Sequence, residues 1–394
     1  MTPDMAALYR LMGLCAWVGA AEGYISDTRL AHIAEQAARV RDWSPAPTWA
    51  EEQGMAPLLC RALKAAGFEP PRDVWRLLQA LALRHRLASR ARTQVLREVA
   101  AAFATAGIPA RFVKGAALAY LVYPGPELRP MRDVDLLVAP DDALRAQSLL
   151  GELGFQAPLP SGALPDRHLR EGFRFVDGFR VTLEVHHNLF NPEDAPLSLQ
   201  MEDLTRPPLA FSLPECALAA QILPMQTLDA ETLLWHLCQH MRLSSGVFGA
   251  NRLIWMADVV NVAERLVNDV DWDWLRAHHP VVLKTLSLLH FLIPLSGQLR
   301  ARAGVAPGHA PAGIGEDFCG WPHTSLAEQR DKGWGGILRD TFFPPEWWLR
   351  LYYALGSDTP TLWARGARHP FHILGWTWHL FLERIGWYNA RHSG

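Results

Sequence analysis

The sequence predicts an α+β fold, in which a small mixed sheet lies between largely α-helical N- and C-terminal regions. Residues 1 to about 100 have leucine and alanine at helical spacing and no strand-like run, and helical spacing returns after about residue 200. Between these regions, short apolar runs alternate with helical segments. Strands and helices in this mixture are typical of a small domain whose strands share one sheet.

The length of 394 residues predicts two or three domains, or one core with large helical additions. We place a helical N-terminal domain at 1–104, the mixed-sheet core at 105–195 and a helical C-terminal domain at 196–394. The composition, 49% apolar and 20% charged, is that of a globular protein. The net charge of −2 argues against nucleic acid as a partner without ruling out a local basic patch.

The cysteine pattern predicts a reduced, cytoplasmic compartment. The five cysteines are scattered and form no CxxC pair, which argues against a disulfide framework and a cysteine zinc site. The apolar run Leu11–Ala21 follows Asp4 and is interrupted by glycine, so we expect an amphipathic helix and not a signal peptide. We expect no transmembrane span, because no window reaches the roughly 20 uncharged apolar residues that one needs.

Arginine is dense in the helical region that precedes the core. We interpret these residues as a solvated helix face, in preference to an electropositive wall beside an anionic ligand. The residues are Arg72, Arg76, Arg84, Arg86, Arg90, Arg92 and Arg97.

The core begins after Gly107, where the sequence changes from helical spacing to short apolar runs. Proline ends its first helix, and Asp177-Gly178 between two alternating runs is a strong hairpin signal. The expected elements, in order, are a strand at 108–113, a helix from Ala116 to about Tyr123, a strand at 132–138, a helix that opens at 140–142, and two strands at 173–176 and 179–186.

Asp133 and Asp135 form the first candidate site. They are two residues apart on a predicted strand, so both carboxylates project from the same face. Two like charges held together repel, and a divalent cation bound between them removes that cost. Carboxylate oxygens suit hard cations, which predicts Mg²⁺ or Mn²⁺ at this position.

Glu184 and His186 share one face of the last predicted strand. If this strand pairs beside the aspartate strand, Glu184 supplies a third carboxylate. Three carboxylates on adjacent strands can bind two metal ions and orient a nucleoside triphosphate (NTP). Whether His186 belongs to the site is left open by its position alone.

Lys114 and Gly115 precede a predicted helix, where a glycine allows close approach to a phosphate and the helix supplies N–H groups. Lysine is rare here, with four against 34 arginines, so its use suggests a need for a compact point charge. Arg129 and Arg132 flank the acidic strand. They either contact phosphates or neutralise the two aspartates, and the sequence does not choose between these roles.

The ordered set of words resembles the polymerase-β-like nucleotidyltransferase superfamily, and is most similar to its group of largely uncharacterised bacterial members. The resemblance covers roughly residues 50 to 300, and its first two words are the most specific. The words are 112–118 (FVKGAAL), 128–138 (LRPMRDVDLLV) and 183–187 (LEVHH), followed by the helical words 234–240 (LWHLCQH) and 252–258 (RLIWMAD).

This resemblance implies a nucleotidyltransferase core and the superfamily's chemistry. Asp133 and Asp135 would bind both metal ions, and Glu184 would hold the catalytic metal and help activate the acceptor. Where the superfamily usually has Gly-Gly or Gly-Ser before the helix, this chain has Lys114-Gly115-Ala116, which leaves the triphosphate contacts unspecified.

We therefore expect an enzyme that moves a nucleoside monophosphate group from an NTP to a hydroxyl or similar acceptor and releases pyrophosphate. The acceptor would be a small molecule, a peptide or a protein, for example in a tailoring pathway. The alternative is a binding or regulatory protein that kept the fold and lost the chemistry, and the presence of all three carboxylates argues against it.

Three further features have structural interpretations. His236 and His240 are i, i+4 on a predicted helix, but no glutamate follows the first, so we expect packing histidines and not a zinc site. Either Asp271 or Asp273 is expected to cap a helix. The C-terminal tryptophans Trp363, Trp376, Trp378 and Trp387 are expected in a core or an interface and not in a membrane anchor.

Overall fold

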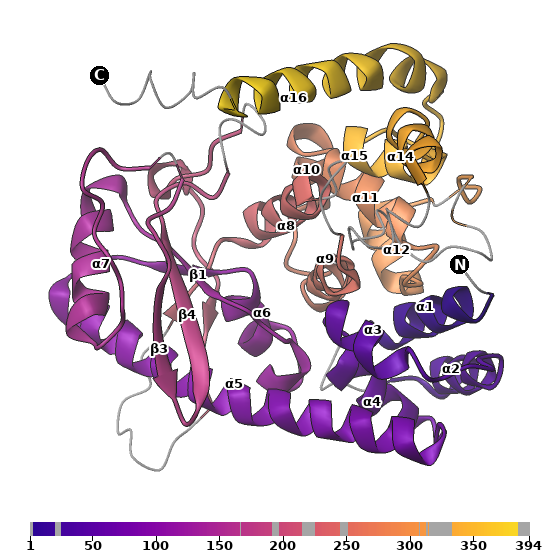
Figure 1. Cartoon of the computed structure of the whole chain (residues 1–394), viewed down its shortest axis with the longest axis horizontal. Coiled ribbons are helices and arrows are strands. Elements are labelled where there is room, and N and C mark those ends of the chain that lie inside the picture. The colour runs from indigo at the N-terminus through magenta and orange to yellow at the C-terminus, as the bar shows by residue number, and fades with distance from the viewer. Residues whose placement is uncertain are drawn as a thin grey trace.

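Five helices form the N-terminal part of the chain (Figure 1). The computed structural model describes residues 3–19, 25–165, 167–190, 197–214, 225–244, 251–306, 308–312, 314 and 333–384. The helix α5 runs for 35 residues and ends at Gly107, whose φ of 65° is readily adopted only by glycine. The five helices are α1 (Pro3–Cys15), α2 (Asp27–Ala38), α3 (Ala46–Glu52), α4 (Ala56–Ala65) and α5 (Arg72–Ala106).

A four-stranded mixed sheet follows, as the sequence predicts. Its strand order is β1-β2-β4-β3, with β2 and β4 parallel and the two outer pairs antiparallel. The elements of this region are β1 (Arg111–Val113), α6 (Gly115–Leu121), η1 (Pro126–Leu128), β2 (Val134–Leu137), η2 (Pro140–Asp142), α7 (Ala143–Glu152), β3 (Gly172–Val176) and β4 (Phe179–His186).

The hairpin between β3 and β4 turns at Asp177 and Gly178, with φ angles of 49° and 80°. Two consecutive positive φ angles define the turn whose twist matches that of antiparallel strands. The hairpin expected from the Asp-Gly pair is thus confirmed.

Helices predominate among the described residues that follow β4, which confirms the α+β class. This part of the chain contains η3 (Met201–Asp203), β5 (Ala210–Phe211), β6 (Met225–Gln226), α8 (Ala230–Ser244), α9 (Leu253–Arg265), α10 (Trp272–His278), α11 (Val281–Leu289), α12 (Gly297–Ala303), α14 (Gly333–Phe342), α15 (Glu346–Tyr353), η4 (Ala364–Arg368) and α16 (His369–Arg384).

The N-terminal and C-terminal helices share one hydrophobic core, although they lie far apart in the sequence. Buried residues of α1, α2 and α4 join those of α8, α9, α11 and α15 in this core. The buried Asn261 of α9 ties the two parts together, because it donates to the carbonyl of Ala16 and accepts from the amide of Val18. The proposed boundaries at 104 and 195 stay a prediction, but the two helical regions pack as one body.

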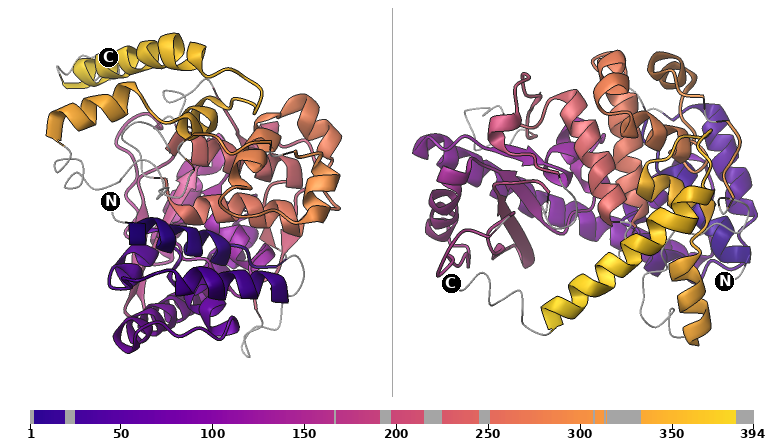
Figure 2. Two further views of the ribbon diagram at one scale, coloured as in Figure 1. Left: turned by 90° about the vertical axis from the view of Figure 1, so that its right-hand side faces the viewer. Right: turned by 90° about the horizontal axis from the view of Figure 1, so that it is seen from above.

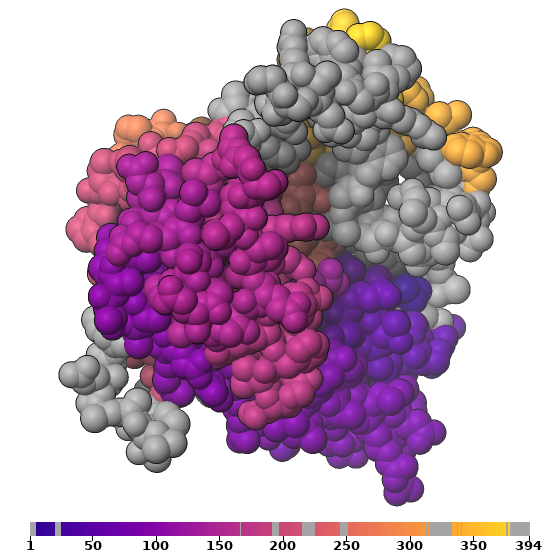
Figure 3. All heavy atoms as spheres, turned by 60° about the vertical axis from the view of Figure 1, so that its left-hand side comes forward, coloured from indigo at the N-terminus to yellow at the C-terminus, as the bar shows by residue number. Residues whose placement is uncertain are grey.

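A second core lies under the sheet. It joins the C-terminal half of α5 with the inner faces of the strands and of α7. Because α5 contributes to both cores, it connects the sheet region to the N-terminal helices, and the two pack side by side (Figures 1 and 3). The aspartate strand β2 lies inside the sheet, between β1 and β4.

Other expectations about single residues have mixed outcomes. Asp271 caps α10, because its side chain accepts from the amide of Trp274 at 2.9 Å. Among the described cysteines, Cys15, Cys60 and Cys238 are free. Cys216, Cys319, Trp387 and the side chain of Trp376 lie outside the described part of the chain.

Candidate active site

Asp135 and Glu184 are brought together by strand pairing. β2 and β4 run parallel with Asp135 opposite Glu184, so both side chains project from one face of the sheet. His186 lies on the same face, and its Nε2 is 2.8 Å from Asp135 Oδ1 and 3.2 Å from Glu184 Oε2. One ligand atom from each of the three residues lies within 4.8 Å of the others, a spacing that suits a metal ion.

Asp133 lies directly before β2 and lines the same pocket as Asp135. Burial and the neighbouring Asp135 carboxylate raise the pKa of Asp133, and the Glu184 carboxylate adds to the effect. A cation bound nearby would stabilise the ionised form of Asp133. The expected convergence of all three carboxylates on one point stays a prediction, because the compact set consists of Asp135, Glu184 and His186.

Lys114 supplies the cation nearest to Asp135. Its Nζ lies 2.7 Å from Asp135 Oδ1, and the two side chains are 13% and 3% exposed. Burial opposes ionisation of Asp135, but the Lys114 ammonium and the hydrogen bond with His186 outweigh it and hold the pKa of this carboxyl well below its usual range. The acidic site is therefore neutralised in part by the protein itself.

The backbone at Lys114 is strained. Lys114 has φ 51° and ψ −134°, a conformation that glycine adopts easily and a residue with a Cβ does not. The next residue must be small, since a Cβ on Gly115 would lie 2.7 Å from Met131 Cγ. The tight turn that presents the Lys114 side chain therefore depends on Gly115.

Arg129 is fixed by a buried ion pair with Asp258 of α9. Its Nε donates to both carboxylate oxygens at 2.8 and 3.0 Å, and its Nη2 donates to Oδ2 at 2.6 Å. The hydroxyl of Tyr123 donates to the same carboxylate at 2.8 Å. Arg129 therefore does not bond directly to Asp135, and Lys114 is the cation that does. Arg129 instead joins the site to α9 through Asp258.

A pocket of about 190 Å³ opens beside the acidic residues. Burial, together with the charges of Arg132 and Arg129, lowers the pKa of Arg252 to about 10. Crowded like charges of this kind indicate an anionic ligand. The pocket is lined by Lys114, Gly115, Arg129, Met131, Arg132, Asp133, Asp135, Leu237, His240, Arg252, Trp255 and Asp258.

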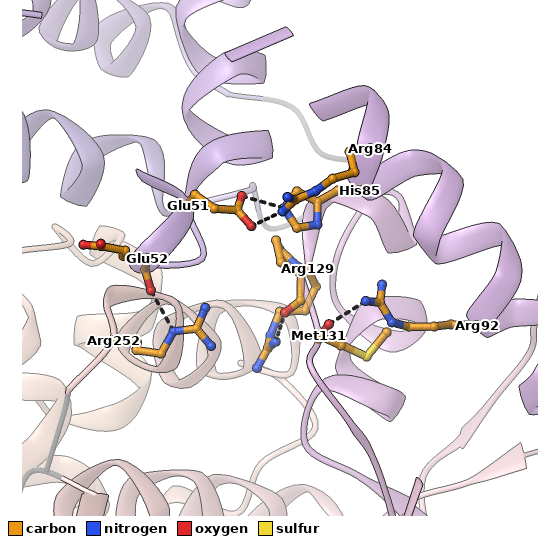
Figure 4. A network of polar contacts seen from close by, with 9 residues as sticks. Glu51, Glu52, Arg84, His85, Arg92, Arg129, Met131 and Arg252 are labelled. Atoms are coloured by element: carbon orange, nitrogen blue, oxygen red, sulfur yellow. Dashed lines mark hydrogen bonds and ion pairs between the residues drawn. The ribbon is translucent and has the colours of Figure 1, made fainter. Parts of the chain in front are cut away.

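Backbone contacts hold the cations around this pocket (Figure 4). Arg252 Nε donates to the carbonyl of Glu52 at 2.9 Å, and Arg92 donates to the carbonyl of Met131 at 2.6 Å. Arg92 is therefore not a member of a purely solvated helix face. It anchors the segment that leads into Asp133, whereas Arg86 and Arg90 of the same helix are exposed.

The sequence of the chain identifies its family. Residues 39–292 match the model of an uncharacterised nucleotidyltransferase family. The chain belongs to this family. Comparison with curated proteins and with solved structures found no significant match.

The nucleotidyltransferase site includes residues that sequence reasoning did not single out. Arg252 caps the N-terminus of α9, and Trp255 and Asp258 follow at intervals of three residues, so one side of the start of this helix lines the pocket. All three belong to the segment 252–258, which resembles the nucleotidyltransferase group in sequence but carries no predicted site residue. Their spacing was the available signal, but nothing in the sequence showed that α9 faces β2.

The two helix histidines differ in their surroundings. His236 is fully buried, and burial lowers its pKa to about 3, so it is the neutral packing residue that was expected. His240 was also expected to pack in a core. It instead lines the pocket, with its ring 5.2 Å from that of Trp255 in an edge-to-face arrangement.

The donor set fits a divalent cation. Two carboxylates and an imidazole offer ligand atoms within 4.8 Å of one another, and oxygen donors suit Mg²⁺ or Mn²⁺. His186 is in contact with both carboxylates, so it can also orient them as ligands.

Among the described helices, none is both long and apolar enough to cross a membrane.

We predict that replacing Lys114 separates backbone strain from charge. Lys114→Ala removes the ammonium and keeps a Cβ at φ 51°, whereas Lys114→Gly removes both. Strain at such a position costs on the order of 1–3 kcal/mol, partly offset by the greater freedom of unfolded glycine. Lys114→Gly should therefore be more stable than Lys114→Ala by about 1 kcal/mol in urea unfolding. A Lys114→Gly variant less stable than Lys114→Ala would show that the turn is unstrained, because only the freedom of unfolded glycine would then distinguish the two.

A second prediction concerns the buried ion pair. Asp258→Ala leaves the Arg129 guanidinium buried without its counter-ion, so it should lower the free energy of unfolding by roughly 3–5 kcal/mol. The matched control is Asp273→Ala, because Asp273 is 92% exposed and its ion pair is with Arg276 of the same helix α10. Similar losses in the two variants would contradict a special role for the buried pair.

Proposed function

We propose that this chain transfers a nucleoside monophosphate group from an NTP to a hydroxyl or similar acceptor and releases pyrophosphate, with Mg²⁺ or Mn²⁺ as cofactor. The observation that supports this most is that acidic and basic side chains line the same pocket. The carboxylates of Asp133 and Asp135 line this pocket together with the cations Lys114, Arg132 and Arg252. Glu184 lies beside Asp135 on the neighbouring strand.

The cations would hold the triphosphate. Three guanidinium groups and one ammonium converge on the pocket, and three of the four are partly or fully buried. Charges of both signs act on Arg252, since Asp133 and Glu51 oppose the effect of the arginines on its pKa. A polyphosphate placed between them relieves the repulsion among the cations.

Asp133, Asp135 and Glu184 would hold the metal. A bound divalent cation would neutralise the triphosphate and stabilise the attacking and leaving oxygens. Lys114 is already bonded to Asp135, and the ammonium can turn toward a phosphate when a metal ion takes its place on the carboxylate. His186 would hold the carboxylates of Asp135 and Glu184 in a fixed orientation during the reaction.

In this reaction the acceptor oxygen bonds to the α-phosphorus and the bond from that phosphorus to the bridging oxygen breaks. Glu184 remains ionised at neutral pH, because the hydrogen bond with His186 lowers its pKa. Its carboxylate can therefore orient the acceptor hydroxyl and accept its proton as the new bond forms, while pyrophosphate leaves with the bridging oxygen. The acceptor is proposed to be a small molecule, a peptide or a protein.

A binding or regulatory protein without turnover is the second candidate. The Lys114–Asp135 ion pair favours it, because this pair satisfies the central carboxylate without a metal ion. The two candidates differ in whether the α–β bond of an NTP is cleaved.

The third prediction tests turnover. Each common NTP is incubated with Mg²⁺ or Mn²⁺, and pyrophosphate release is followed with water as a poor acceptor. Asp135→Asn should abolish release, since it removes a charge from the proposed metal site and the counter-ion of Lys114. The control Asp141→Asn alters an exposed carboxylate outside the site and should retain full activity. Release of phosphate in place of pyrophosphate would contradict the proposed reaction.

The fourth prediction assigns the two ends of the nucleotide. Trp255 is half-buried in the pocket one turn after Arg252, so its indole can stack on a base while the arginine contacts phosphate. Trp255→Leu should weaken NTP binding by about 1–3 kcal/mol in calorimetry and leave inorganic tripolyphosphate binding unchanged. Arg252→Gln should weaken both ligands. An equal loss of both in Trp255→Leu would place the base elsewhere.

A further inference from the structure

The segment 167–169 continues the sheet along the end of β4. His168 pairs with His186 in an antiparallel bridge, and their rings lie 4.9 Å apart. The carbonyl of Arg167 accepts a hydrogen bond from the amide of His187 at 3.0 Å. The segment is therefore fixed next to the histidine that contacts both carboxylates of the candidate metal site.

The side chain of Arg167 has no partner in the described part of the chain. Its Nε is buried and makes no hydrogen bond, and its guanidinium forms no ion pair with a described carboxylate. Arg174 of β3 also has a buried Nε without a partner, but its Nη2 pairs with Glu98. A buried polar atom without a partner costs free energy, and a bound anion would recover it.

The guanidinium of Arg167 lies on the α8 side of the sheet. The helix α8 lies between the sheet and α11 (Figures 1 and 2). Burial lowers the pKa of His236 and His240 of α8, and the positive charges of Lys114 and Arg167 add to this effect. Because His240 lines the active-site pocket, Arg167 faces the same interior space as the groups of the site.

The two carboxylates of the metal site are reached from different sides. Asp135 lines the pocket that contains the cations, whereas Glu184 does not. Glu184 is nevertheless 21% exposed, and its charge acts on His168. The exposed part of Glu184 therefore lies on the side of β4 along which the segment 167–169 runs.

We infer that the acceptor of the proposed transfer reaction carries an anionic group, a carboxylate or a phosphate, and that Arg167 binds it. This inference rests on the proposed function. In an in-line displacement the acceptor oxygen bonds to the α-phosphorus opposite the bridging oxygen, which leaves with pyrophosphate. The pocket cations would hold the pyrophosphate, so the acceptor approaches from the Glu184 side, where Arg167 is available.

The chemistry of arginine selects an anion among the possible acceptor groups. A guanidinium forms two parallel hydrogen bonds with a carboxylate or a phosphate, and these are stronger than bonds to neutral groups. A cationic acceptor would instead be repelled, because Arg167 has no carboxylate partner to offset its charge.

Ligand-observed NMR titrations of the full chain test this inference without requiring turnover. The probes are glycerol, glycerate and glycerol 3-phosphate, which share hydroxyl groups and differ in charge. They are titrated with Mg²⁺ and inorganic tripolyphosphate present to fill the cation pocket. The wild type should bind at least one anionic probe about 10-fold or more tightly than glycerol, as expected for hydrogen bonds to a charged group. Arg167→Gln should remove this preference.

The matched control is Arg170→Gln, which removes the same charge from an exposed residue of the same loop and should keep the preference. Thermal melts show whether both variants fold, and Arg167→Lys should retain part of the preference, because it keeps the charge without the planar fork.

Four results would each overturn the inference: equal binding of the three probes by the wild type, an unchanged preference in Arg167→Gln, an equal loss in Arg170→Gln, or displacement of the anionic probes by tripolyphosphate. The last result would place the probes in the nucleotide pocket. Pyrophosphate release is measured separately. Its absence, with anion binding that depends on Arg167, would reject the transfer reaction and retain the anion site.

Discussion

The buried ion pair between Arg129 and Asp258 is the contact on which the geometry of the site depends. It joins the segment that enters the aspartate strand to α9, which belongs to the helical core. Burial makes the pair costly to break, since either partner alone would remain charged in a dry environment. Because Arg252 and Trp255 lie on the same face of α9, the ion pair also sets where these side chains stand relative to Asp133 and Asp135.

Lys114 shows how local strain and electrostatics are combined in this site. Its backbone occupies a conformation suited to glycine, and its ammonium neutralises the buried carboxylate of Asp135. The strain is sustained by the surroundings, because Gly115 packs tightly against Met131 and Met131 is held in turn by Arg92. When a metal ion and a polyphosphate bind, the metal ion can replace Lys114 as the partner of Asp135, and the polyphosphate can replace Asp135 as the partner of Lys114.

The sheet and its acidic pair could be predicted closely, because strand alternation and the Asp-Gly turn are local signals. The expected strands at 173–176 and 179–186 agree with β3 and β4 to within one residue at each end. The strand expected at 132–138 is shorter, since regular pairing is limited to Val134–Leu137. The pocket could not be predicted to the same degree. His240 was taken for a core residue, because a helical period shows which residues share a face and not what that face meets.

The sequence by itself determined the α+β class, the order of the elements and the residues that carry charge at the edge of the sheet. It did so because turns, strand alternation and helix caps depend on neighbours within a few residues. Only the tertiary structure decided that the N- and C-terminal helices share one core, and that Arg252 and Trp255 face the acidic strand. These contacts join residues more than a hundred positions apart, and packing between surfaces, not local spacing, selects them.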